Sequence, residues 1–197
     1  MDNLLSIFLF TVVMTITPGP NNIMILASGL NFGIKHSIPH LLGIAIGFPM
    51  MLIAVGFGLD VLIGEAPAFR IIIKILGVGY LLFLAYKMFT MRKAKKLESN
   101  TNPLTFLQAV FFQWVNPKAW IMIFSGIGLF ATGADMQADT FVIAASFFVA
   151  VILCTGTWLF LGSQMQKIIK SDTHFKLFNR GMAILLLVSV LPSALKI

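Results

Sequence analysis

Charged side chains are scarce in this sequence, and their scarcity excludes most soluble folds. Asp, Glu, Lys and Arg make up 11% of its 197 residues, against 58% hydrophobic residues. Soluble domains carry about 25% charged residues, so this supply cannot cover a water-exposed surface. No charge occurs between Leu4 and Ile34, whereas about 20 apolar residues suffice for a helix to cross the hydrocarbon layer. The sequence therefore predicts an all-α integral membrane protein.

Cysteines and catalytic motifs are also scarce. The single cysteine, Cys154, excludes an intrachain disulfide, and its apolar neighbours indicate a small core residue. There is no GxSxG, no HExxH and no nucleotide-binding loop, so we expect neither an enzyme nor an ATP-driven pump, and no cofactor. His36 and His40 have the spacing of metal ligands but lack a third ligand. We expect no metal site and interpret them as a mobile pair at the membrane interface.

Six apolar segments are long enough to cross a membrane, and we expect them to form a single transmembrane domain over residues 1–197. They run approximately over 4–30, 38–59, 69–90, 104–131, 140–163 and 177–196. Basic residues gather in alternate connections, at Lys35, at Arg92, Lys93, Lys95 and Lys96, and at Lys167, Lys170, Lys176 and Arg180. Short basic loops stay cytoplasmic, which places both termini outside the cytoplasm. The net charge of +7 is then a signal for topology and anionic lipid, and no nucleic-acid partner is expected.

The six segments divide into two halves, 1–98 and 99–197, that enter the membrane in opposite directions because each half has three spans. Related halves of this kind form an inverted repeat, a common plan of secondary transporters. A similar irregularity occurs in the first span of each half: TPGPNN at Thr17–Asn22 and QWVNPKAW at Gln113–Trp120. We therefore predict a 3+3 inverted repeat in which spans one and four are broken at proline.

The first break is expected between Thr17 and Pro20. Proline removes a backbone donor and clashes with the preceding turn, so Pro18 frees the carbonyl of Met14 and Pro20 frees that of Ile16. Proline is also a favoured first residue of a new helix. We expect one half-helix to end near Thr17 and a second to begin near Pro20.

This break would place a donor end and an acceptor end side by side inside the membrane. A helix start binds anions through its free amides and its dipole, so the amides of Asn21–Ile23 suit a carboxylate. The freed carbonyls of Met14 and Ile16 suit an ammonium group. A zwitterionic amino acid carries both charges. The residues predicted to surround it are Thr15, Thr17, Pro18, Gly19, Pro20, Asn21 and Asn22.

The second break adds Asn116, Pro117 and Lys118 to the predicted site. Pro117 frees the carbonyl of Gln113, and Lys118 carries a charge that costs at least about 2.5 kcal/mol near the bilayer centre. A bound carboxylate would offset that cost. Three simpler interpretations stay open, in which Pro117 only kinks a helix, Lys118 extends toward the interface, and the asparagines only join helices.

Small residues indicate where helices approach closely. Gly43 and Gly47 have the GxxxG spacing in the second span, which favours close helix contact over a pore lining. Small residues on several faces would also permit a homodimer.

TPGPNN at Thr17–Asn22 and NPKAW at Asn116–Trp120 resemble the paired signatures of the LysE/RhtB amino-acid exporter family, and the length and six-span pattern fit along essentially the whole chain. The resemblance implies an exporter in the cytoplasmic (inner) membrane that moves small amino acids or their derivatives outward, driven by the proton gradient. Members that move basic amino acids would suggest more acidic residues near the site. The branch for neutral substrates fits better: homoserine, threonine, cysteine, O-acetylserine or branched-chain residues.

Coupling to protons needs an ionisable group that both proton and substrate can reach. The centres of the spans contain no Asp or Glu, so Lys118 is the candidate that alternately holds a proton and pairs with the substrate carboxylate. Two other functions remain open at this point. An inorganic-ion carrier would use the same freed carbonyls as cation ligands, and in a non-transporting scaffold or receptor the breaks would serve packing alone.

Overall fold

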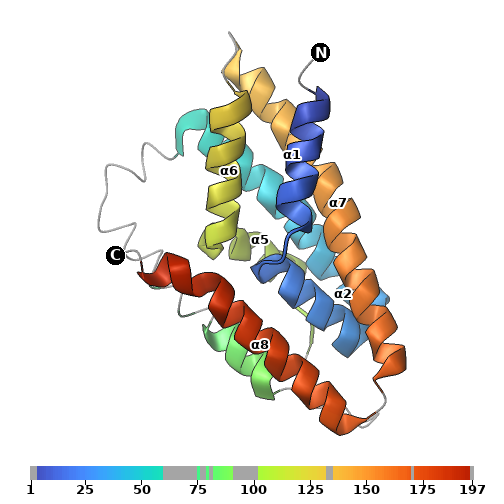
Figure 1. Ribbon diagram of the computed structural model, residues 1–197. Coiled ribbons are helices and arrows are strands. Elements are labelled where there is room, and N and C mark those ends of the chain that lie inside the picture. The colour runs from blue at the N-terminus through green and yellow to red at the C-terminus, as the bar shows by residue number, and fades with distance from the viewer. Residues whose placement is uncertain are drawn as a thin grey trace.

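The computed structural model describes residues 4–59, 82–90, 102–131, 135–169 and 171–195, with Ile75 and Gly79, and these residues are almost entirely helical. Figure 1 shows α1, α6 and α7 running roughly along the long direction of the molecule, with α2 and α8 oblique to it. Their bounds are α1 Leu4–Ile16, α2 Pro20–Ala54, the π-helical turn η1 Val55–Leu59, α5 Phe106–Val115, α6 Pro117–Phe130, α7 Met136–Ile168 and α8 Asp172–Leu195. A further helical segment covers residues 82–90.

Helix α2 consists of two helical arms, and the chain reverses its direction between them at Gly33. Gly33 has φ 75° and ψ 176°, a conformation that glycine adopts without the strain a Cβ would cause. The hydroxyls of Ser28 and Ser37 lie 2.7 Å apart, whereas nine residues of straight helix would separate them by about 13 Å. The arms 20–32 and 34–54 are therefore neighbours, and the chain turns back where the sequence predicts the end of the first span.

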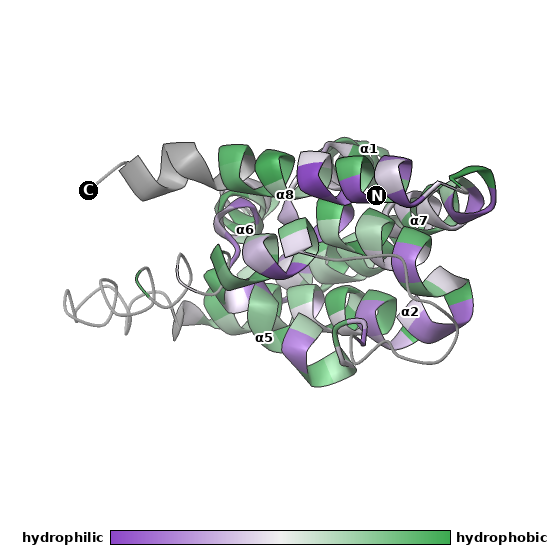
Figure 2. Cartoon of the chain, turned by 90° about the horizontal axis from the view of Figure 1, so that it is seen from below, coloured by the Kyte–Doolittle hydropathy of each residue, from purple (hydrophilic) through white to green (hydrophobic). Residues whose placement is uncertain are grey.

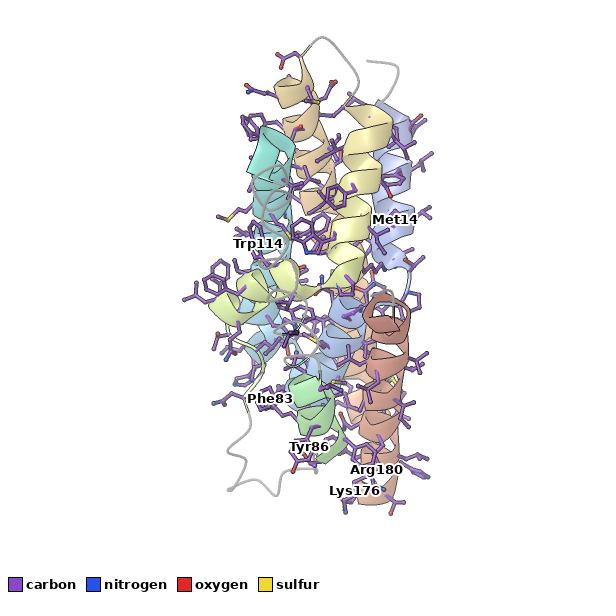
Figure 3. The ribbon with its side chains drawn as sticks, turned by 90° about the vertical axis from the view of Figure 1, so that its left-hand side faces the viewer. Met14, Phe83, Tyr86, Trp114, Lys176 and Arg180 are labelled. Carbon is purple, nitrogen blue, oxygen red and sulfur yellow. The ribbon has the colours of Figure 1, made fainter. Side chains whose placement is uncertain are left out.

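The first predicted span consists of α1 and the arm 20–32, interrupted at residues 17–19 as expected. Each piece has 13 residues and is about 20 Å long, too short to cross a hydrocarbon layer of about 30 Å. The two pieces together are long enough. The interruption therefore lies near the middle of this segment, at mid-height of the molecule where Figure 3 labels Met14.

The segment 104–131 is interrupted as well, because α5 ends at Val115 and α6 begins at Pro117. The chain bends sharply at Asn116, so that α5 lies across the direction of α6 (Figures 1 and 3). Helix α5 has a well-defined start at Thr105, which forms a capping box with Gln108 through bonds of 3.3 and 3.0 Å. The fourth predicted span is thus a transverse half followed by an upright half.

The later helices are longer than the predicted spans. Helix α7 covers residues 136–168 where the sequence predicts 140–163, and α8 covers 172–195 where it predicts 177–196. Half of the predicted span 69–90 lies outside the described residues. The six-span inverted repeat therefore stays a prediction, whereas the all-helical class and the two proline breaks are observed.

Glycines bring two pairs of segments into close contact. A Cβ on Gly43 would overlap the carbonyl of Phe106, and one on Gly47 would lie 2.7 Å from the Cα of Val110. The predicted close helix contact at this GxxxG pair is confirmed, with α5 as the partner. In the same way a Cβ on Gly162 of α7 would overlap the carbonyl of Leu26 in α2.

The described buried residues form four apolar clusters, of which two are large. One large cluster joins arm 20–32 to segment 82–90 and α8, around Ile23, Leu84 and Leu186. The other joins α1, arm 34–54, α6 and α7, around Phe48 and Phe147. The outer surface is also apolar, as the green faces in Figure 2 show. Its exposed side chains include Leu5, Leu9, Phe111, Ile121, Leu153 and Leu185, an arrangement suited to lipid.

Candidate functional site

The two helix breaks, about a hundred residues apart in sequence, contact each other directly. The Lys118 Nζ of the second break donates to the backbone carbonyl of Thr17 at 2.6 Å and to its hydroxyl at 2.8 Å. Beside this contact, Asn21 Nδ2 donates to Gln113 Oε1 at 2.8 Å, and Gln113 Nε2 donates back to Asn21 Oδ1 at 3.3 Å. The structure therefore brings Thr17 and Asn21 of the first break and Lys118 of the second, all predicted from the sequence, into one cluster.

The carbonyls freed by proline in the first break are not bare. The Thr17 hydroxyl donates to the carbonyl of Met14 at 2.9 Å, and the Trp158 indole donates to that of Ile16 at 3.0 Å. The expectation that both carbonyls would be open to a ligand is therefore corrected. An unsatisfied carbonyl in a membrane interior costs several kcal/mol, and these side chains remove that cost.

Asn22 closes the rest of the broken end. Its buried amide donates to the carbonyls of Thr15 at 2.7 Å and of Thr17 at 2.9 Å, and its oxygen accepts from the Thr155 hydroxyl at 3.2 Å. Asn22 thus ties the end of α1 to the start of α2 and both to α7. This is a structural role in holding the break, in addition to any contact with a ligand.

At the start of α2, two backbone amides are not used in hydrogen bonds within the described residues. Gly19 is the N-cap residue in an extended conformation, and its carbonyl accepts from the Ile23 amide at 2.9 Å. The expectation that the Ile23 amide is free is therefore wrong. The amides of Asn21 and Asn22 have no hydrogen-bond partner among the described residues. This helix start can still receive an anion.

The second break, in contrast, satisfies its own backbone. The Asn116 side chain accepts from the Lys118 amide at 3.1 Å, and its carbonyl accepts from the Ala119 amide at 3.0 Å. The carbonyl freed by Pro117, that of Gln113, accepts from the Asn116 amide at 3.2 Å. The second break therefore contributes the Lys118 side chain to the site, and no free amide.

A small cavity of about 20 Å³ lies between the breaks. Besides break residues it is lined by Ile44, Phe48, Met122, Val151 and Thr155, and Lys118 is the one charged residue among the described side chains around it. The Thr15 hydroxyl lies at this cavity, 5% exposed, without a hydrogen-bond partner in the described part of the chain. The site therefore combines an ammonium, two free amides and an unused hydroxyl with an apolar wall.

Three residues of the cluster were missed from the sequence: Gln113, Thr155 and Trp158. Gln113 stands three residues before Asn116, and its 0% exposure is unusual for a glutamine. A polar residue within an apolar span is a weak signal that it meets another polar group. That signal alone does not reveal which helix face Thr155 and Trp158 occupy.

The histidines and the cysteine lie outside this cluster. His40 is 1% exposed, so the interpretation of His36 and His40 as a mobile interfacial pair is wrong for His40. His36 is exposed and lies 3.2 Å from the carbonyl of Phe32 through its Nδ1. Cys154 is 5% exposed, as expected of a core residue.

The fold and site define a helical membrane protein whose paired helix breaks build a polar centre, the plan of a transporter. The chain belongs to the LysE family: the family model described as LysE type translocator matches residues 12–190. Similar curated proteins include cysteine/O-acetylserine efflux proteins of Escherichia coli O1:K1 / APEC, 28% identical, and of Salmonella choleraesuis (strain SC-B67), 29% identical, each over 95% of this chain and 93% of the relative. No solved structure matches. The protein is accordingly a membrane transporter of this family and not an enzyme.

Proposed function

We propose that the protein exports small neutral amino acids or their derivatives across the cytoplasmic (inner) membrane, by alternating access around the two breaks. The supporting observation is the contact between the breaks, through Lys118 with Thr17 and Asn21 with Gln113. Ionisable and polar side chains within membrane-spanning segments are rare, and they commonly mark the path of a substrate or ion. The proposal includes six spans in a 3+3 inverted repeat, with both termini outside the cytoplasm.

The substrate carboxylate binds at the start of α2. The free amides of Asn21 and Asn22 point along the helix axis, and the helix dipole favours an anion there. The Lys118 ammonium is close by, since its Nζ would lie 3.2 Å from a Cβ placed on Gly19. A carboxylate between these groups receives two backbone donors and one cation.

The substrate ammonium binds at the hydroxyl side of the cavity. Thr15 has an unused oxygen there, and Thr155 lies opposite on α7. In the structure the Lys118 ammonium is bound to the Thr17 carbonyl. It therefore occupies part of the carbonyl end of α1, which the sequence analysis assigns to the substrate ammonium. Binding would therefore exchange the internal contact of Lys118 with Thr17 for one with the substrate carboxylate.

The charge of the cavity favours neutral substrates. Among the described residues that line it, Lys118 carries the only charge, so a basic amino acid would bring an uncompensated second cation. The apolar wall of Ile44, Phe48 and Met122 suits a short side chain. The names of the relatives, cysteine/O-acetylserine efflux proteins, suggest that these two compounds are the first substrates to test.

The cavity must widen to accept an amino acid. A volume of about 20 Å³ has room for about one water molecule. The breaks are the natural hinges for this widening, because the two halves of each interrupted helix share no backbone ladder across the break. We propose that the proton gradient drives this cycle, with Lys118 exchanging a proton when the carboxylate leaves it.

Counterflow in proteoliposomes tests this proposal. Vesicles loaded with unlabelled cysteine or O-acetylserine should accumulate the labelled compound, whereas empty liposomes and vesicles loaded with lysine should not. Lys118→Gln should lose acceleration by an imposed pH gradient, with Lys118→Arg as the variant that keeps the charge. Absence of counterflow with every amino acid would favour a non-transporting scaffold. Uptake of inorganic cations alone would favour an ion carrier. Full gradient-driven efflux by Lys118→Gln would remove Lys118 from the mechanism.

A further inference from the structure

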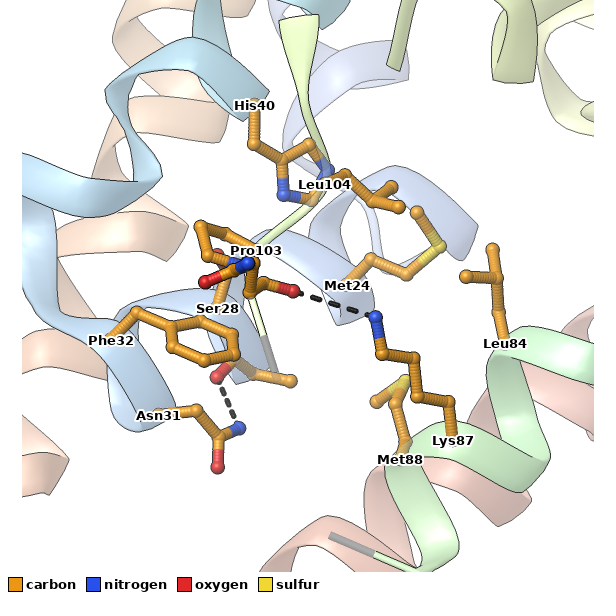
Figure 4. A pocket seen from close by; sticks show the side chains of 12 residues that line it. Met24, Ser28, Asn31, Phe32, His40, Leu84, Lys87, Met88, Pro103 and Leu104 are labelled. Atoms are coloured by element: carbon orange, nitrogen blue, oxygen red, sulfur yellow. Dashed lines mark hydrogen bonds between the residues drawn. The ribbon is translucent and has the colours of Figure 1, made fainter. Parts of the chain in front are cut away.

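A second cavity, of about 50 Å³, lies beside the arm 20–32, one to three turns beyond the break. Met24, Ser28 and Asn31 of that arm face it, together with His40 of the other arm and Lys87 of segment 82–90. Figure 4 shows the His40 ring and the Lys87 amine directed into the space between these segments. On the predicted topology this cavity lies between the break and the cytoplasm.

His40 is buried at this cavity, and its ring nitrogens make no hydrogen bond in the described part of the chain. The residue is 1% exposed, and neither ring nitrogen has a hydrogen-bond partner within the described ranges. Leaving a buried polar group unsatisfied costs about 1–3 kcal/mol. A neutral imidazole offers one donor and one acceptor, and neither is used among the described residues, so a small side-chain movement would let a ligand in the cavity reach them.

Lys87 is the second group with spare capacity. It is half-buried, and its ammonium makes one long hydrogen bond, 3.5 Å to the carbonyl of Asn102, within the described part of the chain. An ammonium group has three donors. No other charged side chain is found among the described residues that line the cavity, so Lys87 gives it a positive field.

The polar side chains that arm 20–32 contributes to the cavity are already engaged. Ser28 is bound to Ser37 at 2.7 Å. Asn31 donates to the carbonyl of Ala27 at 2.6 Å and exchanges hydrogen bonds with Asn179 of α8. Besides the exposed Asn102 side chain, the unused capacity is therefore that of one cation and one imidazole, beside an apolar wall that includes Met24 and Met88.

We propose that this cavity is a second amino-acid site, which holds a small zwitterion on its way from the cytoplasm to the break. The Lys87 ammonium binds the carboxylate, His40 accepts from the ammonium or donates to the carboxylate, and the short side chain lies against the methionines. The limited volume restricts the ligand to small molecules. This inference rests on the proposed export function and gives the substrate path a first binding step.

Sided transport measurements test the inference. Inverted membrane vesicles present the cytoplasmic face to labelled cysteine, and right-side-out vesicles present the other face. Lys87→Gln and His40→Leu should raise KM at the cytoplasmic face at least about tenfold, the effect of losing a hydrogen bond to a charged group, with no change at the other face. Lys35→Gln and His36→Leu are matched controls, because both residues are exposed and neither lines the cavity.

Stability separates a binding role from a packing role. Removing an unpartnered buried imidazole relieves a cost, so His40→Leu should keep or raise the unfolding temperature while KM rises. His40→Gln, which restores a donor and an acceptor, should recover part of the affinity. If His40→Leu does not fold, the cytoplasmic KM of Lys87→Gln alone decides whether the cavity binds substrate. Proteoliposomes of phosphatidylcholine and phosphatidylglycerol contain no lipid ammonium of the ethanolamine type, and the effect should persist in them.

Two outcomes would overturn the inference by itself. Wild-type transport combined with an unchanged cytoplasmic KM in both Lys87→Gln and His40→Leu would show that the cavity holds no substrate. An effect that disappears in vesicles without phosphatidylethanolamine would assign the cavity to a lipid headgroup. Failure of the wild-type protein to transport any amino acid would instead remove the proposed function itself.

Discussion

A single methyl group at Gly19 should separate Lys118 from Thr17 without removing any charge or hydrogen-bonding group. Gly19 has φ −177° and ψ 178°, extended backbone that alanine also adopts. The added Cβ would lie 2.6 Å from Lys118 Cδ and 3.2 Å from its Nζ. Carbon atoms pack best at about 3.5–4.0 Å, so the lysine side chain must move by about 1 Å.

That movement is enough to disrupt the contact between the breaks. The Lys118 Nζ bonds to Thr17 are 2.6 and 2.8 Å long, and an added 1 Å brings both close to or beyond the usual limit. A hydrogen bond to a charged group contributes about 1.5–3 kcal/mol, and the partly exposed setting favours the lower value. If Lys118 also binds the carboxylate, Gly19→Ala should raise KM about tenfold.

The measurement combines transport with thermal unfolding. In counterflow assays KM for cysteine should rise, while the loss of the N-cap glycine costs below about 1 kcal/mol, or no more than about 4 °C for a chain of this size. Gly128→Ala on α6 is the matched control, because nothing lies within 4 Å of its added Cβ. An unchanged KM in a folded Gly19→Ala protein would refute the idea that Lys118 must stand at the break for substrate to bind.

Two further predictions concern stability. Asn21→Leu and Gln113→Leu, measured alone and together by thermal unfolding in detergent, should show a coupling of about 0.6–1.7 kcal/mol, and strictly additive effects would contradict the paired hydrogen bonds. Gly162→Ala should destabilise by about 1–3 kcal/mol, since its Cβ would overlap the backbone carbonyl of Leu26. Gly156→Ala on the same helix meets open space and should not, so equal effects would contradict close backbone packing there.

The helix breaks were predictable from sequence because their cause is local. A proline removes its own amide and hinders the preceding turn wherever it stands, so Pro20 and Pro117 mark helix starts without any tertiary information. The class of membrane protein was predictable for the same reason, since it depends on long apolar runs of neighbouring residues. Family membership follows from the same motifs.

The partners of the broken ends were not predictable in the same way. Which side chain satisfies a freed carbonyl depends on how helices rotate against each other, and the Trp158 indole reaches Ile16 across 142 residues of sequence. Lys118 illustrates the limit: sequence places it beside a substrate carboxylate, whereas the structure binds it to the Thr17 carbonyl. Both placements satisfy one ammonium group, and sequence cannot choose between them.

By itself, then, the sequence determined where this chain must leave helical geometry and that it does so inside an apolar bundle, because backbone chemistry acts on neighbouring residues. The tertiary structure decided that the two breaks meet, and that His40 is buried beside a cavity instead of at an interface. That burial depends on the reversal at Gly33, which brings arms 20–32 and 34–54 together. Such contacts join residues through space, and no local pattern specifies them.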